Sequence, residues 1–218
     1  MKKRRILCLT GVLALGLGLT IALLWVLGGS TTPVTAAPAS RPLQASGDVY
    51  CVTPVSQTYA GCTRVFTSVQ FAVDAAIGGE IVKIAAGIYT DIHRRSNITQ
   101  VVYIDIPITI RGGYTTTDNF AGPPDPDTYP TTLDAGGQGR VVYVTGVTAT
   151  LEGLRLTNGS ASNGGGIHAS STTTRSLVIS GCQVYSNAAT PNGGGIYITD
   201  SYFPTLTGNK IYSNTASN

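Results

Sequence analysis

The hydrophobic and polar positions in the last third of the chain follow one pattern that recurs at a nearly fixed spacing. Apolar residues at alternate positions precede a glycine, and another apolar residue and an asparagine follow it. The pattern is centred on Gly153, Gly181 and Gly208, which are 28 and 27 residues apart. The first two repeats then continue into triple glycines at residues 164–166 and 193–195. A fixed period between 20 and 50 residues is typical of solenoids, in which each coil buries its apolar side against its neighbours.

The alternation within each repeat predicts which side chains face the core, because successive side chains of a strand point to opposite faces. Two columns are apolar in all three repeats and should face inward: Leu151, Ile179, Leu206 and Leu156, Val184, Ile211. Two columns should then face water: Arg155, Gln183, Lys210 and Thr157, Tyr185, Tyr212. We expect the asparagines Asn158, Asn187 and Asn214 to form left-handed corners and to hydrogen-bond along the stack. The triple glycines permit positive φ and close backbone approach. A parallel β-helix satisfies all of these conditions.

A helix over residues 66–78 is expected to cap the N-terminal end of the solenoid. Thr67 and Gln70 have the spacing of a capping box, and Phe66 and Phe71 have the spacing of a hydrophobic staple. One face is apolar, formed by Val69, Ala72, Val73 and Ala76. An amphipathic helix before the first strand would cover core and strand edges that an open solenoid end exposes. We therefore assign residues 48–79 to an N-terminal cap.

Short strands are predicted after the cap, at residues 80–85, 101–104, 108–111, 140–145 and 148–151. The segment at residues 115–132 contains four prolines and should loop out of the coil as an insertion. Its acids Asp118, Asp125 and Asp127 would suit calcium, which prefers oxygen ligands, or would belong to a solvated, turn-rich loop. Their spacing matches no calcium-binding loop.

The first 37 residues predict export. Lys2, Lys3, Arg4 and Arg5 precede an apolar run at residues 6–28, and small residues lead to a cleavage site after Ala36 or Ala37. The run is also long enough for an uncleaved anchor. These 37 residues hold four of the 14 Lys and Arg and none of the 11 Asp and Glu, which leaves ten basic against eleven acidic residues. A nucleic-acid partner is therefore not expected. Residues 38–47 are interpreted as a linker, and residues 80–218 as the coils.

Export would allow disulfides to persist, so we pair Cys51 with Cys62; the alternative is two free thiols. Cys182 takes the repeat position of Leu154 and should be buried. Cys8 would leave with a cleaved signal.

Two motifs of the repeat resemble those of a known family. The Gly-Gly-Gly-Ile motif and the Val184-Tyr185-Ser186-Asn187 motif are similar to the repeats of polymorphic outer-membrane proteins. The helix-then-strand start and the stretch at residues 109–114 resemble secreted right-handed β-helix proteins of the pectin-lyase-like superfamily. The resemblance covers about residues 48–218 and implies an all-β fold, a right-handed parallel β-helix with an N-terminal capping helix. In the outer-membrane subset it implies surface display and adhesion.

No catalytic constellation accompanies the fold. Glycoside hydrolysis needs two carboxylates about 5 to 9.5 Å apart, and the only acids after Asp134 are Glu152 and Asp200, at different repeat positions. His93 and His168 are expected to be exposed and structural. We expect a non-enzymatic secreted or cell-surface protein, structural or adhesin-like, without a cofactor or bound metal. The alternative is a polysaccharide lyase or glycoside hydrolase whose catalytic coils follow residue 218.

The outward columns offer a surface for a partner. Arg155, Gln183, Lys210, Tyr185 and Tyr212 would form a ladder that could bind an acidic glycan, either a polysaccharide or the surface of a host or neighbouring cell. The alternative is a solvated face whose tyrosines suit strands. Contact with a membrane is expected only through an uncleaved N-terminal segment. The spacing of the repeat places the next glycine triplet at position 220, which predicts a longer gene product.

Overall fold

A computed structural model of the chain describes residues 47–200 and 202–217. The predicted signal or anchor at residues 1–37 lies outside the described residues, as does the predicted linker apart from Gly47. Within the described residues the chain is almost entirely β-structure, with one short helix, α1 (Val69–Ala75).

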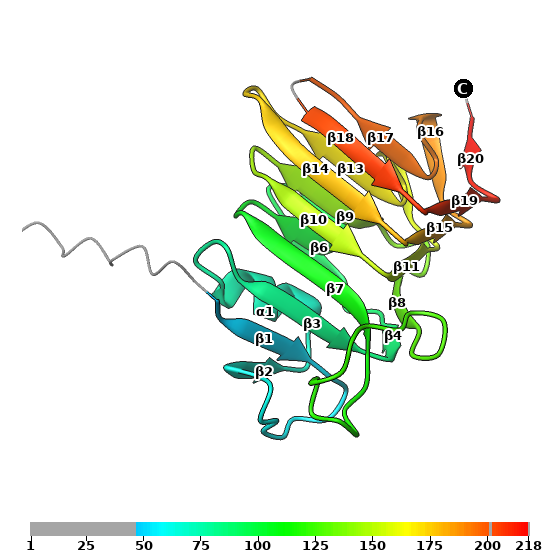
Figure 1. Cartoon of the computed structure of the whole chain (residues 1–218). Helices are drawn as coiled ribbons and strands as arrows, with labels where there is room; N and C mark the ends of the chain where they lie inside the picture. Colours follow the sequence, from blue (N-terminus) through cyan, green and yellow to red (C-terminus); the bar gives the residue numbers. More distant parts are fainter. Residues whose placement is uncertain (1–46, 201, 218) are drawn as a thin grey trace, which may run out of the picture. The chain divides into compact units, whose positions relative to one another are not determined.

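The strands form four sheets (Figure 1). Sheet A contains β1 (Val49–Val52), β2 (Arg64–Phe66), β3 (Ile81–Ala85), β7 (Ile108–Tyr114), β10 (Ala149–Glu152), β14 (Arg175–Ser180) and β18 (Tyr202–Thr207). Sheet B contains β4 (Gly87–Tyr89), β8 (Thr131–Asp134), β11 (Leu154–Thr157), β15 (Gln183–Tyr185) and β19 (Lys210–Tyr212). Sheet C contains β5 (His93–Arg95), β6 (Ile98–Ile104), β9 (Arg140–Thr145), β13 (Ile167–Ser170) and β17 (Ile196–Ile198). Sheet D contains β12 (Ser160–Asn163), β16 (Ala188–Asn192) and β20 (Thr215–Ala216).

The chain visits the sheets in a fixed order, which defines a parallel β-helix. From β9 in sheet C it passes to β10 in sheet A, β11 in sheet B and β12 in sheet D, and then returns to sheet C at β13. Each strand therefore pairs with its counterpart one coil away. These pairings are parallel, and among the strands that the structure describes only the short β5 lies antiparallel to its neighbour, β6. The predicted fold class is confirmed.

The inward columns of the repeat lie in register and fill the core, as predicted. Leu151 pairs with Ile179 in sheet A, and Leu156 pairs with Val184 in sheet B; all four are fully buried. In the last described coil the same columns hold Leu206 and Ile211, which are 44% and 50% exposed. Cys182 is completely buried, as predicted, and burial raises the pKa of its thiol to about 11.

The asparagine prediction was half right. The left-handed corner is formed by Asn158, Ser186 and Ser213, with φ of 54°, 54° and 51°, so in the later coils the corner residue precedes the asparagine. Asn187 instead points inward and is 1% exposed. Its Nδ2 donates to the Leu156 carbonyl and its Oδ1 accepts the N–H of Gly159, both in the previous coil.

Asn214 repeats this arrangement one coil later. Its Nδ2 donates to the Val184 carbonyl, and its Oδ1 accepts from the backbone N–H and the Nδ2 of Asn187. Gly159 takes the equivalent place in the preceding coil, where an added Cβ would lie only 1.8 Å from the Gly165 carbonyl oxygen. The stacked amides thus satisfy backbone groups that the turn leaves unpaired inside the coil.

Helix α1 closes the N-terminal end of the coil, as expected, but it is shorter than the predicted 66–78 and is held differently. The four residues of the predicted apolar face, Val69, Ala72, Val73 and Ala76, are buried. The capping box and the staple were wrong: the N-cap is Ser68, without a side-chain hydrogen bond, Phe66 belongs to β2, and Phe71 is 58% exposed.

Gln70 has another role, because its side-chain amide completes the edge of β6. Its Oε1 accepts the N–H of Tyr103 at 2.6 Å, and its Nε2 donates to the Tyr103 carbonyl at 3.2 Å. This pair of bonds replaces the peptide group that a neighbouring coil would supply. The buried Glu80 acts similarly after the helix, since its carboxylate accepts the N–H groups of Ile77 and Gly78.

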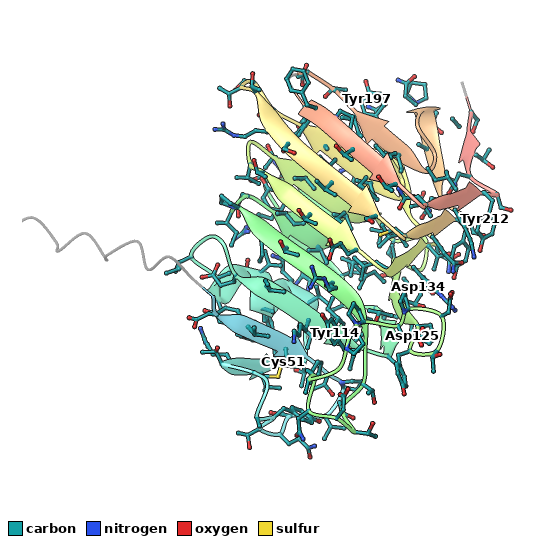
Figure 2. The ribbon with its side chains drawn as sticks, in the orientation of Figure 1. Cys51, Tyr114, Asp125, Asp134, Tyr197 and Tyr212 are labelled. Carbon is teal, nitrogen blue, oxygen red and sulfur yellow. A yellow bond between two sulfur atoms is a disulfide. The ribbon has the colours of Figure 1, made fainter. Side chains whose placement is uncertain are left out.

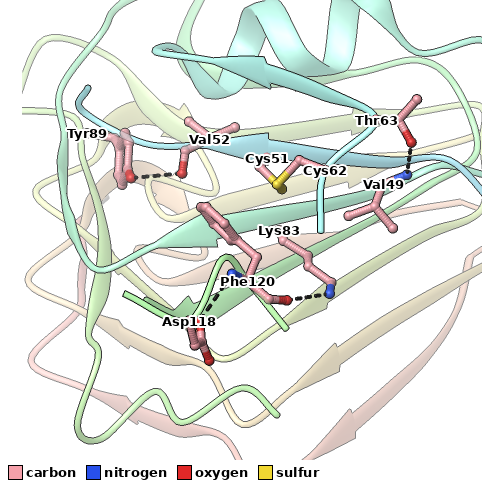
Figure 3. The surroundings of a disulfide bond; sticks show 9 residues. All are labelled: Val49, Cys51, Val52, Cys62, Thr63, Lys83, Tyr89, Asp118 and Phe120. Carbon is pink, nitrogen blue, oxygen red and sulfur yellow. Dashed lines mark hydrogen bonds between the residues drawn. A yellow bond between two sulfur atoms is a disulfide. The ribbon is translucent and has the colours of Figure 1, made fainter. Parts of the chain in front are cut away.

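The predicted insertion leaves the coil between β7 and β8 as expected, and it is anchored to the cap through Phe120 while its other residues are exposed or half-buried. Phe120 is fully buried in a second, smaller hydrophobic cluster with Cys51, Tyr59, Ala85 and Tyr114. The predicted pair Cys51 and Cys62 is joined by a disulfide beside this cluster, with 5.7 Å between the two Cα atoms (Figure 3). Lys83 donates to the Phe120 carbonyl at 2.8 Å and fixes the insertion to sheet A.

Candidate functional site

The outward column predicted on the repeat exists on sheet B. Arg155, Gln183 and Lys210 occupy paired positions on β11, β15 and β19. The stacking of strands therefore brings together three residues that are 28 and 27 positions apart in the chain. In parallel sheets such neighbours lie about 4.8 Å apart. The result is a row of two cations with an amide between them.

The next outward column, Thr157, Tyr185 and Tyr212, is also in register, but its members differ in exposure. Tyr185 and Tyr212 stack face to face, with 5.1 Å between ring centroids and 4° between ring planes, and Tyr212 lies on the outer surface of the last coil (Figure 2). Thr157, which was predicted to face water, is only 4% exposed. At its end of the column Asn158 donates to Asp134, so a pair of polar side chains occupies this turn.

A groove of about 190 Å³ lies beside the cationic row. One side is formed by Arg155, Gln183 and Lys210, and the floor by the corner glycines Gly153, Gly181 and Gly208. These glycines have φ between 60° and 64°, a conformation that other residues rarely adopt. Because a single glycine makes each corner, the corners at Gly181 and Gly208 are open, and an added Cβ there would meet no described side chain within 4 Å.

The insertion builds the other wall of this groove. Residues 115–130 replace the single corner glycine in the coil that joins β7 to β8. Pro126 and Asp127 of the insertion line the groove, and an added Cβ on Gly153 would lie 3.3 Å from Pro126. The groove therefore exists because one coil has a long corner next to coils with short corners.

The groove carries cations that the protein leaves unneutralised. Within the described residues, neither Arg155 nor Lys210 has an acidic partner within 4.0 Å; the ion pairs there join Arg95 to Asp74 and Asp105, and Arg111 to Glu152. The Nε of Arg155 is buried without a hydrogen-bond partner. Asp127 is the one carboxylate that lines the groove. The arrangement suits a ligand with spaced acidic groups and hydroxyls.

The acids of the insertion serve its own turns. Asp118 accepts the N–H groups of Phe120 and Gly122, and Asp125 accepts those of Asp127 and Thr128. The bonds from Thr128 lower the pKa of Asp125. Among the residues that the structure describes, no group of three His, Cys, Asp or Glu side chains is placed to hold a metal ion.

The other acids and histidines that we considered for catalysis lie apart. Glu152 forms an ion pair with Arg111 on sheet A, and Asp200 accepts a hydrogen bond from Thr199. His93 lies 3.4 Å from the hydroxyl of Ser68. His168 points outward, as expected, but it is half-buried instead of exposed, and burial followed by the charge of Arg140 lowers its pKa to about 4.

Sequence reasoning missed an aromatic column on sheet C. Tyr103, Tyr143, His168 and Tyr197 are paired in register on β6, β9, β13 and β17. Their ring centroids are 5.2, 5.0 and 5.2 Å apart along the column. The chain spacings between them are 40, 25 and 29 residues, so no fixed period reveals the column. Only the pair His168 and Tyr197 was aligned by the repeat.

The fold and its outward columns define the class of this protein, a parallel β-solenoid whose stacked coils present rows of side chains to solvent. Comparison with protein-family models, curated proteins and solved structures finds no match to this chain. Among the described residues, no helix has the length and apolar character needed to cross a membrane.

Proposed function

We propose that this chain is an exported, non-enzymatic β-helix protein that binds acidic polysaccharide along sheet B. Its ligand lies in the groove between sheet B and the insertion, with its acidic groups at Arg155 and Lys210 and a hydroxyl at Gln183. The partner is a polysaccharide or the glycan coat of a host or neighbouring cell. The observation that carries the proposal is the row of unneutralised cations in register beside a groove.

Three features support this assignment of the groove. The two cations lie two coils apart, a spacing that suits a polymer whose acidic groups recur along its length. The backbone floor allows close approach of a flat chain. The low charge of the rest of the protein, ten basic against eleven acidic residues after residue 37, favours a local electrostatic site over general attraction to polyanions.

Export is supported by the basic and apolar N-terminal segment together with the Cys51–Cys62 disulfide. Surface display and adhesion, which the resemblance to polymorphic outer-membrane protein repeats implies, fit a solenoid whose role is binding. Mass measurement of the protein recovered from the medium or envelope would test removal of the segment, with cleavage expected after Ala36 or Ala37.

The direct test removes the cations of the groove. The double variant Arg155→Gln/Lys210→Gln should lose roughly 5- to 30-fold in retention on immobilised pectate, because each exposed charge contact contributes about 0.5 to 1 kcal/mol. Retention of the native protein should also fall as salt is raised, since salt screens exposed charges. The matched control is Arg64→Gln/Arg175→Gln, which removes the same charge from sheet A and should bind normally.

Two results would contradict the proposal. Equal loss in both double variants would mean that net charge, and not the groove, governs retention. Release of unsaturated or reducing ends from pectate or alginate by the native protein would show an enzyme and overturn the non-enzymatic assignment.

The tyrosines next to the cationic row allow a finer test of the same groove. In Tyr185→Ser/Tyr212→Ser retention should weaken only a few-fold, because the two rings cover each other's faces and leave edges and one outer face for a sugar. Unchanged retention would remove both residues from the binding surface.

A further inference from the structure

A second groove, on sheets C and D, has the composition of a ligand site. It encloses about 450 Å³, within the range of small-molecule sites. Its inner part is formed by the buried Arg140 and the half-buried Tyr143 and His168, while its rim carries exposed polar residues. The rim residues come from three separate segments: Asn97, Gln138, Ser160 and Ser162. A buried charge and aromatic rings below a polar rim are typical of sites that orient a small polar ligand.

Arg140 is the unusual member of this groove. It is 6% exposed, yet within the described residues it has no acidic partner within 4.0 Å. Its Nε and Nη2 donate to the carbonyls of Asn163 and Gly164, and its Nη1 donates to no described residue. A buried charge is costly unless it is paired with an opposite charge. Two carbonyls and a cation–π contact with the Tyr143 ring, whose centroid lies 5.2 Å from the guanidinium carbon, compensate it only in part. The guanidinium is therefore fixed in place, and its Nη1 keeps N–H groups that an acceptor from outside the protein could take up.

The two rings beside Arg140 differ in what covers them. Tyr143 stacks on Tyr103 with 5.2 Å between ring centroids and also lies under the Arg140 guanidinium, whereas His168 has no stacked neighbour among the described rings. Tyr143 and His168 meet at 69°, and His168 and Tyr197 at 85°. The plane of His168 is thus turned across the planes of both neighbours, and its face is the ring surface against which the C–H groups of a sugar would pack.

We propose that this groove binds one acidic sugar unit, with the sugar ring against His168 and its acid group at Nη1 of Arg140. Only one cation lines the groove, which suits a single carboxylate or sulfate and not the repeated phosphates of a nucleic acid. The site is independent of the sheet B groove, since the two grooves share no residue. A chain with both sites would bind two glycan segments on different faces of one solenoid.

Calorimetric titration with digalacturonate, and with galactobiose as its neutral counterpart, tests this site. It is performed in the Arg155→Gln/Lys210→Gln background, so that failure of the sheet B proposal does not affect the result. We expect one bound digalacturonate per chain and about tenfold weaker binding of galactobiose, because the contact between the acid and Arg140 is charge-assisted. Absence of measurable digalacturonate binding would overturn the inference.

Variants locate the binding in the groove. His168→Leu should weaken binding roughly 3- to 10-fold, whereas His168→Tyr, which copies Tyr197 of the next coil, should bind nearly as well. Arg140→Gln should abolish the preference for the acidic sugar. If this variant fails to fold, Tyr143→Leu replaces it, because it removes the ring that holds the guanidinium and should reduce the same preference. Equal binding by His168→Leu and His168→Tyr, or tighter binding of a thymidine oligonucleotide than of digalacturonate, would overturn the assignment.

Discussion

In the repeating coils from β9 to β20, backbone groups inside each turn find their partners in side chains that recur from coil to coil. In the non-repeating part, the cap at residues 48–79 with the insertion at 115–130, the same task falls to side chains that occur once. Asn187 and Asn214 illustrate the first solution, and Gln70 and Glu80 the second. A side chain that recurs from coil to coil is thus one way to pair the backbone hydrogen-bonding groups of the coils. At an end or an interruption of the stack, side chains that occur once must pair these groups.

The difference extends to the hydrophobic interior. The coils share one continuous core, in which a column such as Leu151 and Ile179 continues through neighbouring coils. The non-repeating part has in addition a small cluster of its own around Phe120. A small cluster has few neighbours to compensate for a lost side chain, so we expect single changes there to have large effects.

Phe120→Ala should have the largest effect. Removal of a fully buried phenylalanine typically costs about 3 to 5 kcal/mol, and here the ring also holds the insertion against the cap. Urea unfolding of the native protein and the variant measures the change in the free energy of unfolding. Phe71→Ala is the matched control, since Phe71 is 58% exposed and should cost less than about 1 kcal/mol. Similar losses in the free energy of unfolding in both variants would show that the buried ring of Phe120 stabilises the protein no more than an exposed ring.

Asn187→Ala tests the repeating solution. It leaves the N–H of Gly159 and the carbonyl of Leu156 without their side-chain partner inside the coil, which should cost about 2 to 4 kcal/mol. Asn192→Ala removes an exposed amide from the same coil and should change stability by less than about 1 kcal/mol. A loss of stability smaller than that of Asn192→Ala would mean that water replaces the side-chain hydrogen bonds of Asn187 at no cost in stability.

Gln70→Ala tests the individual solution at the cap and should cost about 1 to 3 kcal/mol, because the N–H and carbonyl of Tyr103 both lose a partner. Hydrogen exchange should show faster exchange at Tyr103 than in the native protein, while the amide of Val184 in the coils stays protected. Gln57→Ala, at an exposed position, serves as the control. Unchanged exchange at Tyr103 would contradict the role assigned to the Gln70 amide.

The smallest effect on stability should come from protonation of His168 as the pH is lowered. The pKa of His168 is lowered to about 4 in the folded protein, and its ordinary value is 6.5. Between these values the unfolded chain binds the proton more readily, so stability should fall as pH decreases from about 6.5 to 4. His168→Tyr should lose less stability over this range in thermal unfolding, and Tyr197→Phe should behave like the native protein. An identical pH dependence for His168→Tyr would show that His168 titrates normally.

The same contrast explains what the sequence could predict. The inward columns and the row Arg155, Gln183, Lys210 follow from a spacing of 28 and 27 residues, which strand alternation converts directly into position. The corner was misplaced by one residue in the later coils because Asn158 aligns with Ser186 and not with Asn187. Composition cannot distinguish an asparagine that forms the left-handed corner from one whose side chain hydrogen-bonds to backbone groups inside the turn.

What could not be predicted depends on residues far apart without a period. The insertion wall of the sheet B groove, with Pro126 and Asp127, follows from how a proline-rich loop folds back. The aromatic column on sheet C is interrupted in sequence by that insertion, and Gln70 resembled a capping residue although it closes a strand edge 33 positions away. In each case tertiary contact, and not local pattern, fixes the position.

The asparagine ladder gives the solenoid a direction of assembly. Asn187 bonds to Leu156 and Gly159 in the coil before it, and Asn214 in turn bonds to Val184 and Asn187. Each new coil therefore brings the amide that completes its predecessor, and no finished coil needs to reopen when the next one docks. A chain that emerges N-terminus first can close one coil at a time on a template that is already capped by α1.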